Sequence, residues 1–377
     1  MRRKTSRKGT SRPLAKIRAI PRGRMGESMK AYAFLEQNKS GFIEKEAPIC
    51  GARSAIVRPL FVSPCTSDVH NVELGNLAAN RILGHEAVAE VVEVGSMVRD
   101  FKPGDMVIVP AVTPDWGALG SQRGFHQHDH GMLAGYQLAS KIDGVFAELC
   151  RVPFADENLG RLPGSIDPAQ AVMLSDMVTT GFYGAELADI CFGDTVCVLG
   201  IGPVGQMAIL GAKLRGAGRI LAVGTRPVCV EAAKFYGATD IISYKDGSVS
   251  KQVMELTKKQ GADRCIIAGG DDESLKEAVS LICPGGAVAN VGYLTTSGDI
   301  PFPNGRWGFG MGNKTIKGGL CPGGRYRMEQ LANLMKYGRI DVSPMITHIF
   351  NGFENIGDAF RLMEQKPPEL IKVVVRL

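Results

Sequence analysis

Three separate stretches of the chain carry side chains that could bind one metal ion. Cys65 offers a thiolate and His85 an imidazole, the pair of donors that zinc prefers, and Asp176 would add a carboxylate. Three protein ligands with the fourth position open is the arrangement of a catalytic zinc site. The spacing alone leaves an alternative open, in which Cys65 is a small buried residue, His85 a hydrogen-bonded core histidine and Asp176 a helix cap.

The glycine-rich stretch 195–226 offers a second site, because it has the pattern of strand, tight turn, helix and strand. Within it, Gly200, Gly202 and Gly205 form the spacing G-x-G-x-x-G. In a dinucleotide site the first glycine allows the tight turn, the second lets the backbone approach the pyrophosphate, and the third lets the helix pack on the sheet. The helix N-terminus then offers free N–H groups to a phosphate. Because the required strand and helix are both indicated, we predict a dinucleotide site rather than a simple glycine-rich turn.

The end of the second strand in this stretch bears on the choice between NAD and NADP. An NAD-selective site usually carries an Asp or Glu about 20 residues beyond the glycines, which accepts a hydrogen bond from the ribose 2′-hydroxyl. This chain has Gly224, Thr225 and Arg226 there instead. Arg226 could be an ordinary surface charge, but a guanidinium suits a 2′-phosphate and an acid would repel one. The sequence therefore predicts NADP(H).

The composition indicates a globular protein of two domains. With 377 residues, of which 45% are hydrophobic and 22% charged, the chain can build two cores. No apolar run approaches the roughly 20 residues of a membrane span, so no membrane association is expected. The nine cysteines are an odd number without a C-x-x-C pair. They argue against a disulfide framework or a four-cysteine zinc lobe, and favour a reducing, cytoplasmic location.

The basic character of the chain is concentrated in residues 1–28. This segment holds ten of the 44 basic residues and one of the 38 acidic ones, so the formal net charge of +6 becomes −3 for the remainder. The remainder gives no reason to expect nucleic-acid binding. We expect residues 1–28 to be disordered, because they have little apolar content and no periodicity. They could be an organellar transit segment or a binding tail, but an overextended reading frame upstream of Met29 is the interpretation we favour.

The first half of the chain after Met29 is predicted to be rich in strands. Short runs of β-branched residues between turn residues indicate strands at 30–35, 42–45, 54–62, 87–94, 106–109 and 144–152. Together they are typical of a small antiparallel barrel. The irregular stretch 113–141 is long for a loop, which suggests a functional role.

Residues 178–320 instead alternate strands with helices. Candidate strands lie at 195–199, 220–223, 240–242, 264–268, 287–291 and 315–318. Six such strands with helices between them predict a doubly wound parallel sheet. A helix at 328–337 and a strand at 371–375 follow. We therefore expect residues 321–377 to complete a catalytic domain that residues 29–177 begin, with the nucleotide domain inserted between them.

The chain resembles the zinc-dependent medium-chain alcohol dehydrogenases, and among them the NADP-dependent secondary-alcohol (isopropanol) dehydrogenases. Similarity extends from about Met29 to Leu377 and is carried by ILGHEAV, VVEVGS, FKPGD, GMLAG, DMVTTGF, GAELADI, GAKLRGAGRI, EAAKFYGATDI and KTIKGGLCPGGR. The resemblance implies an α/β protein with a GroES-like β-barrel catalytic domain, a Rossmann domain for NADP(H), and a homotetramer. It also implies one catalytic zinc per chain and no structural zinc, since the cysteine-rich lobe of other members is absent.

The resemblance also assigns roles around the metal. It makes Asp176 the third zinc ligand beside the cysteine and the histidine named above, at a position where many relatives have cysteine. Glu86 would lie beside the metal and coordinate it in some states. Ser67 and His70 would relay the substrate proton outward, as hydroxyl and then imidazole. Without the resemblance, a turn hydroxyl at Ser67 and a surface histidine at His70 would be the better interpretation.

Positions that line the substrate pocket and bind the cofactor in this subfamily can be matched to the chain one by one. The pocket positions are Tyr136, Tyr293, Leu320 and Cys321. The cofactor positions, besides the glycines and strand-end residues already named, are Ile201, Pro203, Val204, Tyr244, Val291, Gly292, Tyr293 and Lys366. Relatives often have tryptophan in place of Tyr136, and Tyr244 would lie near the 2′-phosphate. His126, His128 and His130 alternate in a glycine-rich loop, a pattern more typical of a solvated surface than of a second metal site.

Together these residues predict an NADP(H)-dependent secondary-alcohol dehydrogenase, or ketone reductase in the reverse direction, whose substrate is a small secondary alcohol such as 2-propanol. One alternative is another zinc-dependent polyol or amino-alcohol dehydrogenase. A second alternative, of another class, is a non-catalytic NADPH-binding protein. The presence of all three candidate metal ligands argues against the second alternative.

Overall fold

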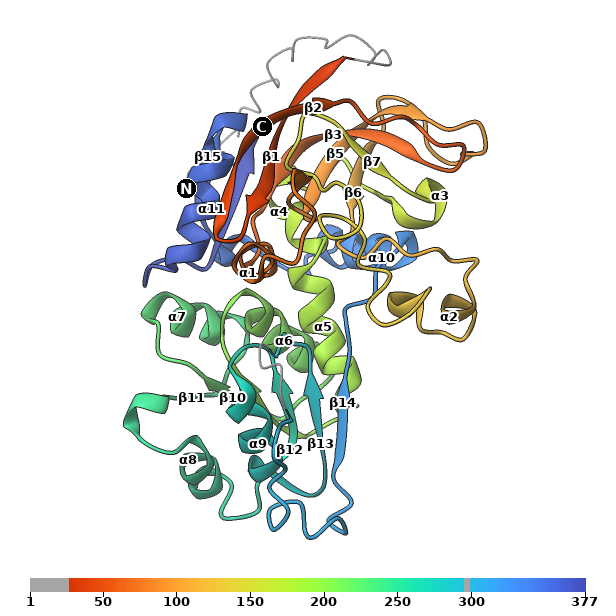
Figure 1. Cartoon of the computed structure of the whole chain (residues 1–377). Coiled ribbons are helices and arrows are strands. Elements are labelled where there is room, and N and C mark those ends of the chain that lie inside the picture. The colour runs from red at the N-terminus through yellow and green to blue at the C-terminus, as the bar shows by residue number, and fades with distance from the viewer. Residues whose placement is uncertain (1–26, 295–298) are drawn as a thin grey trace, which may run out of the picture.

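Residues 27–294 and 299–377 are described by the computed structural model, which has two lobes (Figure 1). A β-rich lobe contains the first part of the chain and its C-terminal part, and an α/β lobe contains the middle. Helix α5 (Met177–Leu187) runs from one lobe toward the other. Residues 1–28 were expected to be disordered, and of these only Glu27 and Ser28 are among the described residues.

The α/β lobe is built on a parallel sheet. In spatial order its strands are β11 (Asp240–Ile242), β10 (Arg219–Val223), β9 (Thr195–Leu199), β12 (Ala262–Ile267), β13 (Ile282–Asn290) and β14 (Thr315–Gly318). The strand order reverses at β9, which lies between β10 and β12, as in a doubly wound nucleotide-binding fold. The predicted fold class is therefore confirmed for this lobe. Strands β9, β11 and β14 match the prediction residue for residue, whereas β13 begins earlier.

The two faces of this sheet are covered by different helices. The helices are α6 (Pro203–Leu214), α7 (Pro227–Tyr236), α8 (Val249–Leu256) and α9 (Asp272–Leu281). Because alternate residues of a strand point to opposite faces, Val196 and Val198 pack with α5, α6 and α7. Cys197 and Leu199 pack on the other side with α8 and α9. Burial on both faces explains why β9 is apolar after its first residue.

The β-rich lobe contains two sheets. The larger has, in spatial order, β15 (Ile346–Asn351), β16 (Lys372–Arg376), β3 (Ala55–Val62), β5 (Ala87–Val94), β6 (Met106–Val109) and β8 (Gly160–Arg161), with β7 (Cys150–Val152) added on β3. The smaller has β2 (Lys39–Glu46), β1 (Ser28–Glu36) and β4 (Arg81–Ile82). Strand β16 pairs antiparallel with β3, which places the C-terminal residues in the same sheet as residues near the start of the lobe.

The strand predicted at 144–152 is wrong for most of its length, since only the last three residues form β7. Gly144 instead donates a backbone hydrogen bond to the carbonyl of Ile82 at 2.9 Å, within an irregular loop. A Cβ on Gly144 would lie 2.1 Å from the carbonyl oxygen of Gly84, so this close approach requires glycine. The loop thereby packs directly onto the segment that precedes β5.

The helices of the β-rich lobe are α1 (Thr66–Leu74), α2 (Leu119–Gln122), α3 (Ala155–Asn158), α4 (Pro168–Ala171), α10 (Arg325–Lys336) and α11 (Ile356–Gln365). Short 3₁₀ helices in the chain are η1 (His126–His128), η2 (Val172–Leu174), η3 (Tyr244–Asp246), η4 (Ser343–Met345) and η5 (Phe353–Asn355). Helix α10 overlaps the helix predicted at 328–337. Helix α1 was not predicted, because it buries only Val69 and Val72 beside a polar Asp68.

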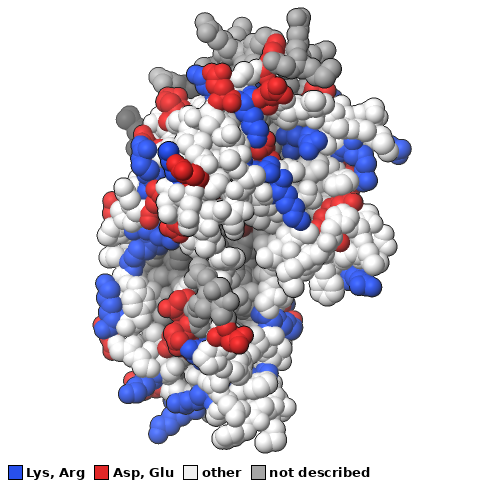
Figure 2. Space-filling model, in the orientation of Figure 1, with Lys and Arg blue, Asp and Glu red and all other residues white. Residues whose placement is uncertain are grey.

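Charged side chains are interspersed on the face of the molecule shown in Figure 2. Lys and Arg lie among Asp and Glu over both lobes, rather than in one continuous basic stripe on that face. A basic stripe is the usual footprint of a nucleic-acid-binding protein. Within the described residues, no helix is both long enough and apolar enough to cross a membrane.

Candidate active site

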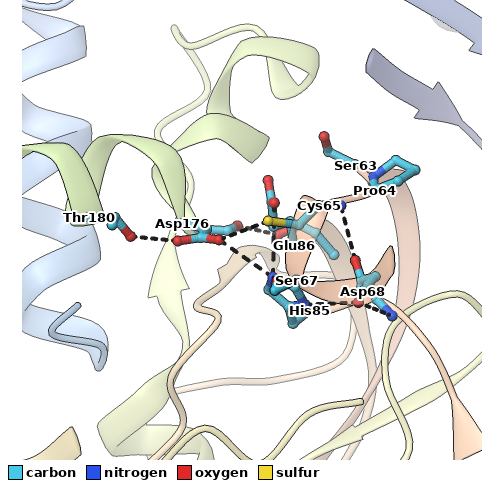
Figure 3. Close-up of polar contacts among 12 residues, drawn as sticks. Ser63, Pro64, Cys65, Ser67, Asp68, His85, Glu86, Asp176 and Thr180 are labelled. Atoms are coloured by element: carbon cyan, nitrogen blue, oxygen red, sulfur yellow. Dashed lines mark hydrogen bonds and ion pairs between the residues drawn. The ribbon is translucent and has the colours of Figure 1, made fainter. Parts of the chain in front are cut away.

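Cys65, His85, Glu86 and Asp176 come together beside the start of α5. Their donor atoms all lie within 4.8 Å of one another, and among residues 27–294 and 299–377 this is the one such group of possible metal ligands. The Sγ of Cys65 is 3.6 Å from Oδ2 of Asp176, and Nε2 of His85 is 3.4 Å from the same oxygen (Figure 3). Nε2 of His85 lies 4.0 Å from Oε1 of Glu86. Distant parts of the chain thus present a thiol, an imidazole and two carboxyl groups to one place.

Each of these donors lies at the end of a secondary-structure element. Cys65 precedes α1, His85–Glu86 forms the turn before β5, and Asp176 precedes α5. Gly84 allows the turn because its φ of +85° is in the left-handed region that favours glycine. A Cβ there would also lie 2.2 Å from the ring of Phe146. Donors on regular elements and a constrained turn are held more precisely than donors on a mobile loop.

A buried carboxylate, Asp68, orients two of the donors. Its Oδ1 lies 3.1 Å from Nδ1 of His85 and accepts a hydrogen bond from the backbone N–H of Gly84 at 3.1 Å. Its Oδ2 accepts a hydrogen bond from the backbone N–H of Cys65 at 3.0 Å. With Nδ1 engaged, Nε2 of His85 faces the cluster, as is usual for a metal-binding histidine. Asp68 was not singled out in the sequence, although its place in the first turn of a helix is typical of a capping carboxylate.

The two carboxyl groups of the cluster are each engaged through one oxygen by a residue outside it. Oδ1 of Asp176 accepts a hydrogen bond from the hydroxyl of Thr180 at 2.5 Å (Figure 3). Oε1 of Glu86 accepts one from Nζ of Lys372 at 2.7 Å. Oε2 of Glu86 is buried and has no hydrogen-bond partner within the described part of the chain. A buried carboxylate oxygen without a partner is costly, and a cation beside it would satisfy it.

Burial of the cluster changes its protonation. Burial raises the pKa of the Cys65 thiol and raises the pKa of Glu86 to about 7. Burial alone would also raise the pKa of Asp176. The hydrogen bond with His85 and the charge of His85 outweigh burial and lower the pKa of Asp176 below its ordinary value. Burial alone would lower the pKa of His85, whereas its polar neighbours, Asp68 among them, raise it well above the ordinary value. A divalent cation would favour the thiolate and carboxylate forms, so this donor set fits a metal ion of the zinc type.

Ser67 and His70 lie three residues apart on α1, and therefore on one face of it. The Oγ of Ser67 is 3.4 Å from Nε2 of His85. His70 lies farther along the helix, half-buried, with its ring centroid 6.0 Å from that of Tyr293. No hydrogen bond joins Ser67 to His70 among the described residues, so a relay between them would need another group. Burial, and then the charge of Lys366, lower the pKa of His70 from 6.5, which keeps the imidazole neutral at neutral pH.

Two of the four predicted pocket residues lie at the cluster. The hydroxyl of Tyr136 is 3.1 Å from Nδ1 of the cluster histidine, and Sγ of Cys321 is 4.0 Å from Oδ1 of the cluster aspartate. Tyr293 is 57% exposed and lies beside the histidine of α1. The carbonyl of Leu320 accepts a hydrogen bond from the side chain of Gln127 at 3.0 Å. That all four line one substrate pocket stays a prediction.

The three histidines of the glycine-rich loop do not converge on one point. The ring of His126 stacks on that of Trp116 with centroids 4.6 Å apart. Nδ1 of His128 accepts a backbone hydrogen bond at 2.9 Å, and Nε2 of His130 lies 3.2 Å from Asp115. In the part of the chain that the structure describes, these histidines form no metal cluster.

A cavity of about 560 Å³ lies at the carboxyl ends of the parallel strands. The predicted cofactor residues that line it are Gly200, Ile201, Gly202, Gly224, Thr225, Arg226 and Tyr244. Residues that sequence reasoning missed include Gly269, Gly270, Asp271 and Ser274, which follow β12. Because β12 pairs with β9, its carboxyl end meets the glycine turn at the point where the strand order reverses. That strand order is the signal that could have indicated them.

The three motif glycines differ in what surrounds them. Gly200 has a φ of +85°, which the tight turn requires. A Cβ on Gly205 would lie 1.9 Å from the carbonyl oxygen of Gly200. A Cβ on Gly202 would meet nothing within 4 Å, although the residue lines the cavity and caps the N-terminus of α6. Gly200 and Gly205 are therefore needed for the turn itself, and Gly202 leaves space for a ligand at the helix N-terminus.

The remaining predicted cofactor residues lie outside this cavity. They are Pro203, Val204 and Gly205 in the first turn of α6, Val291, Gly292 and Tyr293 after β13, and Lys366 at the end of α11. Tyr293 lies beside His70, and the charge of Lys366 acts on the same imidazole. These two residues approach His70 from different lobes. An extended ligand between the cavity and His70 could contact both, but these contacts stay a prediction.

The end of β10 offers hydroxyl and guanidinium groups to the cavity. The hydroxyl of Thr225 donates to that of Tyr244 at 2.8 Å. Arg226 donates through Nη1 to the carbonyl of Leu370 at 2.6 Å, and its other N–H groups make no hydrogen bond within the described residues. A Cβ on Gly224 would lie 2.1 Å from Cγ1 of the neighbouring isoleucine, so a larger residue there requires that side chain to move.

Known proteins match this chain over nearly its whole length. The family models described as alcohol dehydrogenase GroES-like domain and zinc-binding dehydrogenase match residues 51–163 and 203–337. A protein named NADP-dependent isopropanol dehydrogenase from Thermoanaerobacter brockii is 59% identical over 351 residues, covering 93% of this chain and 100% of the relative. A protein of the same name from Clostridium beijerinckii is 57% identical, with the same shares covered.

Among solved structures, alcohol dehydrogenase TADH from Thermus sp. ATN1 matches with a TM-score of 0.81 at 28% identity, over 92% of this chain and 99% of that one. The GroES-like match falls in the β-rich lobe, which confirms the predicted fold class there as well. These matches show that the chain belongs to the family of zinc-dependent medium-chain alcohol dehydrogenases.

Proposed function

We propose that the protein is an NADP(H)-dependent secondary-alcohol dehydrogenase, which oxidises small secondary alcohols such as 2-propanol and reduces the corresponding ketones in reverse. The observation that carries the proposal is the convergence of Cys65, His85, Glu86 and Asp176 within 4.8 Å. Two relatives more than half identical to this chain are both named NADP-dependent isopropanol dehydrogenase, which supports the cofactor and the substrate class.

In this proposal Cys65, His85 and Asp176 hold one zinc ion. The thiolate and the carboxylate together balance the charge of a divalent cation. Bound zinc would supply a Lewis acid for the substrate oxygen, and NADP⁺ a hydride acceptor. Tyr136 and Cys321, which lie against the cluster, would limit the size of the alcohol that enters.

We propose that Ser67 and His70 move the proton of the alcohol outward, with a further hydroxyl group between them. His70→Asn is then expected to slow alcohol oxidation by up to about 100-fold, the lower end of general acid–base contributions. Because the pKa of His70 is lowered, its imidazole is neutral at neutral pH and can accept a proton. Wild-type oxidation should fall in acid, as His70 becomes protonated and can no longer accept a proton. The pH profile of kcat for both proteins measures this, and identical profiles would exclude His70 from the path.

Arg226→Ala is expected to weaken NADP(H) binding by about 10- to 150-fold and to change NAD(H) binding little. A charge-assisted contact with the 2′-phosphate is typically worth about 1.5–3 kcal/mol, which gives this range. Fluorescence titration of NADPH and NADH against both proteins measures it. Thr225→Val is a matched control, which removes a neutral hydroxyl beside the same cavity and should have the smaller effect.

Equally efficient turnover of both cofactors by the wild-type protein would show that the 2′-phosphate site is assigned wrongly. An Asp at position 224 should move the preference toward NAD(H), because the acid would repel the 2′-phosphate. A Cβ there would lie 2.1 Å from Cγ1 of Ile201, so Gly224→Asp is best combined with Ile201→Ala.

We further propose that residues 29–177 and 321–377 form the catalytic domain and residues 178–320 the NADP-binding domain, in a cytoplasmic homotetramer. The pairing of β16 with β3 supports this division. All nine cysteines lie among the described residues and are free thiols, which is compatible with a reducing compartment. Light scattering during size-exclusion chromatography tests the assembly, and a monomeric mass would contradict it.

A panel of alcohols tests the proposed activity. We expect reduction of NADP⁺ to be fastest with 2-propanol and similar small secondary alcohols, and slower with NAD⁺. Faster turnover of polyols or amino alcohols would favour another zinc-dependent dehydrogenase. Tight NADPH binding without turnover of any alcohol would favour a non-catalytic protein.

A further inference from the structure

A buried glutamine connects the glycine turn to helix α7. Gln206, which follows Gly205 in α6, is 0% exposed and does not line the nucleotide cavity. Its Nε2 donates hydrogen bonds to the carbonyl oxygens of Ile201 and Cys229, both at 2.8 Å. Ile201 lies in the glycine turn and Cys229 in the first turn of α7, and both residues line the cavity. One amide group therefore connects two walls of the cavity.

These two walls carry different parts of the proposed cofactor site. The glycine turn is the proposed place of the pyrophosphate, and Arg226 at the start of α7 is the proposed partner of the 2′-phosphate. Arg226 caps the N-terminus of α7, and its carbonyl accepts a hydrogen bond from the N–H of Val230 at 2.9 Å. Because Arg226 and Cys229 belong to the same helical turn, a shift of Cys229 would move Arg226 with it. The contacts of Gln206 therefore fix the separation between the two phosphate sites.

Packing alone does not account for an amide at position 206. Oε1 of Gln206 is buried and has no hydrogen-bond partner in the described part of the chain. Both acceptors at Nε2 are carbonyl oxygens, so turning the amide around would place its oxygen against two others. A buried acceptor without a partner is costly, and a methionine of similar length would fill the same space without one. The two hydrogen bonds that Nε2 donates are what an amide adds here.

The glycine turn itself does not depend on the side chain of Gln206. The N–H of Gly200 donates to the carbonyl of Val223 at 3.2 Å, and the backbone N–H of Gln206 donates to the carbonyl of Gly202 at 2.9 Å. The carbonyl of Ile201, by contrast, accepts a hydrogen bond only from Nε2 of Gln206 among the described residues. Loss of the amide would therefore release the turn from α7 and leave the backbone bonds of the turn in place.

We propose that Gln206 is a positioning residue for cofactor selectivity. By holding the glycine turn against α7, which packs beside α6 in the α/β lobe (Figure 1), it sets the distance between the turn and Arg226 that NADP(H) requires. This inference rests on the NADP(H) site of the proposed function. Gln206 acts on the cofactor through Ile201 and Cys229.

The affinities of a Gln206→Met variant for NADPH and NADH test this proposal. Methionine keeps the length of the side chain and removes both N–H donors. NADPH binding is expected to weaken by about 10-fold, as when one or two neutral hydrogen bonds are lost. NADH binding should change little, because NADH has no 2′-phosphate and the glycine turn persists. Fluorescence titration of both cofactors measures this.

Gln122→Met is the matched control. Nε2 of Gln122 also donates to a backbone carbonyl, that of Gly117 at 2.9 Å, but in the β-rich lobe and outside the lining of the cavity. The same chemical change there should alter neither affinity. Gln206→Leu also removes both donors, and it provides the same test if Gln206→Met does not fold.

The double variant Gln206→Met/Arg226→Ala separates a positioning role from a merely structural one. If Gln206 acts through Arg226, the two changes should not be additive for NADPH. In the Arg226→Ala protein, Gln206→Met should then weaken NADPH binding no more than NADH binding. A merely structural role would lower both affinities alike, with or without Arg226.

The negative outcomes can be told apart. Folded Gln206 variants with the wild-type ratio of NADPH to NADH affinity would overturn the role of Gln206. A selective loss of NADPH affinity that persists without Arg226 would overturn it as well. In both cases the NADP(H) site stands if Arg226→Ala alone weakens NADPH binding. A wild-type protein that does not prefer NADPH to NADH would overturn the proposed cofactor, and the role of Gln206 with it.

Discussion

Replacing Asp176 with asparagine is expected to remove most of the bound zinc and nearly all of the alcohol dehydrogenase activity. The change keeps the shape of the side chain but removes a negative charge and a strong donor atom. Oδ2 of Asp176 lies 3.6 Å from Sγ of Cys65 and 3.4 Å from Nε2 of His85, so the altered oxygen is the one that faces the other donors. The loss of metal affinity should exceed the roughly 10- to 100-fold typical of removing a partner outside the ligand set.

Related variants rank the donors. Cys65→Ser should act like Asp176→Asn, because a serine hydroxyl stays protonated where a thiol would ionise on the metal. Glu86→Gln should be milder, because Glu86 is not one of the three proposed ligands. All three variants should fold, since a catalytic zinc need not hold up the core as a structural zinc does.

Metal analysis, kcat with 2-propanol and NADPH titration measure these effects together. NADPH binding is the internal control, because the nucleotide cavity is lined by other residues and should be unchanged. An Asp176→Asn protein with a full complement of zinc and full activity would remove Asp176 from the ligand set.

Gly205→Ala is expected to abolish NADP(H) binding and to lower thermal stability. A Cβ there would lie 1.9 Å from the carbonyl oxygen of Gly200, a backbone atom that cannot rotate away. The glycine turn and the first turn of α6 would have to separate, which moves the helix N-terminus from the place of the pyrophosphate. Overpacking of this kind typically costs about 1–3 kcal/mol, which a shift of the thermal midpoint measures.

Two other glycines provide matched controls. A Cβ on Gly202 meets nothing within 4 Å, so Gly202→Ala should keep wild-type stability while its methyl group weakens NADP(H) binding in the cavity. Gly164 is equally open but does not line the cavity, so Gly164→Ala should change neither property. A Gly205→Ala protein with wild-type stability and wild-type affinity for NADPH would contradict the placement of the dinucleotide at this turn.

The centre of the α/β lobe was predictable from sequence because strands such as β9 and β10 are buried on both faces. The run at 196–199 is apolar throughout, and the glycines after it specify the turn. The β-rich lobe was less predictable, because local pattern does not report distant partners. The run at 144–152 has strand composition, yet Gly144 bonds to Ile82 in a loop and only β7 joins a sheet. Helix α1 has too short an apolar pattern to be indicated.

The candidate site was only partly predictable, for the same reason. Cys65, His85 and Asp176 could not be brought together from their spacing, and the resemblance to a family supplied their grouping. Two supporting residues went unpredicted because their partners are distant in sequence. Asp68 reaches His85 from another element, and Lys372 is 286 residues from Glu86. Long-range contacts of this kind leave no local signal.

Zinc removal and return, followed by NADPH formation, test the central claim most directly. The purified protein is expected to contain one zinc per chain and to reduce NADP⁺ with 2-propanol. Treatment with a chelator should abolish NADPH formation, and added zinc should restore it. A metal-free preparation with full, chelator-resistant activity would contradict the account.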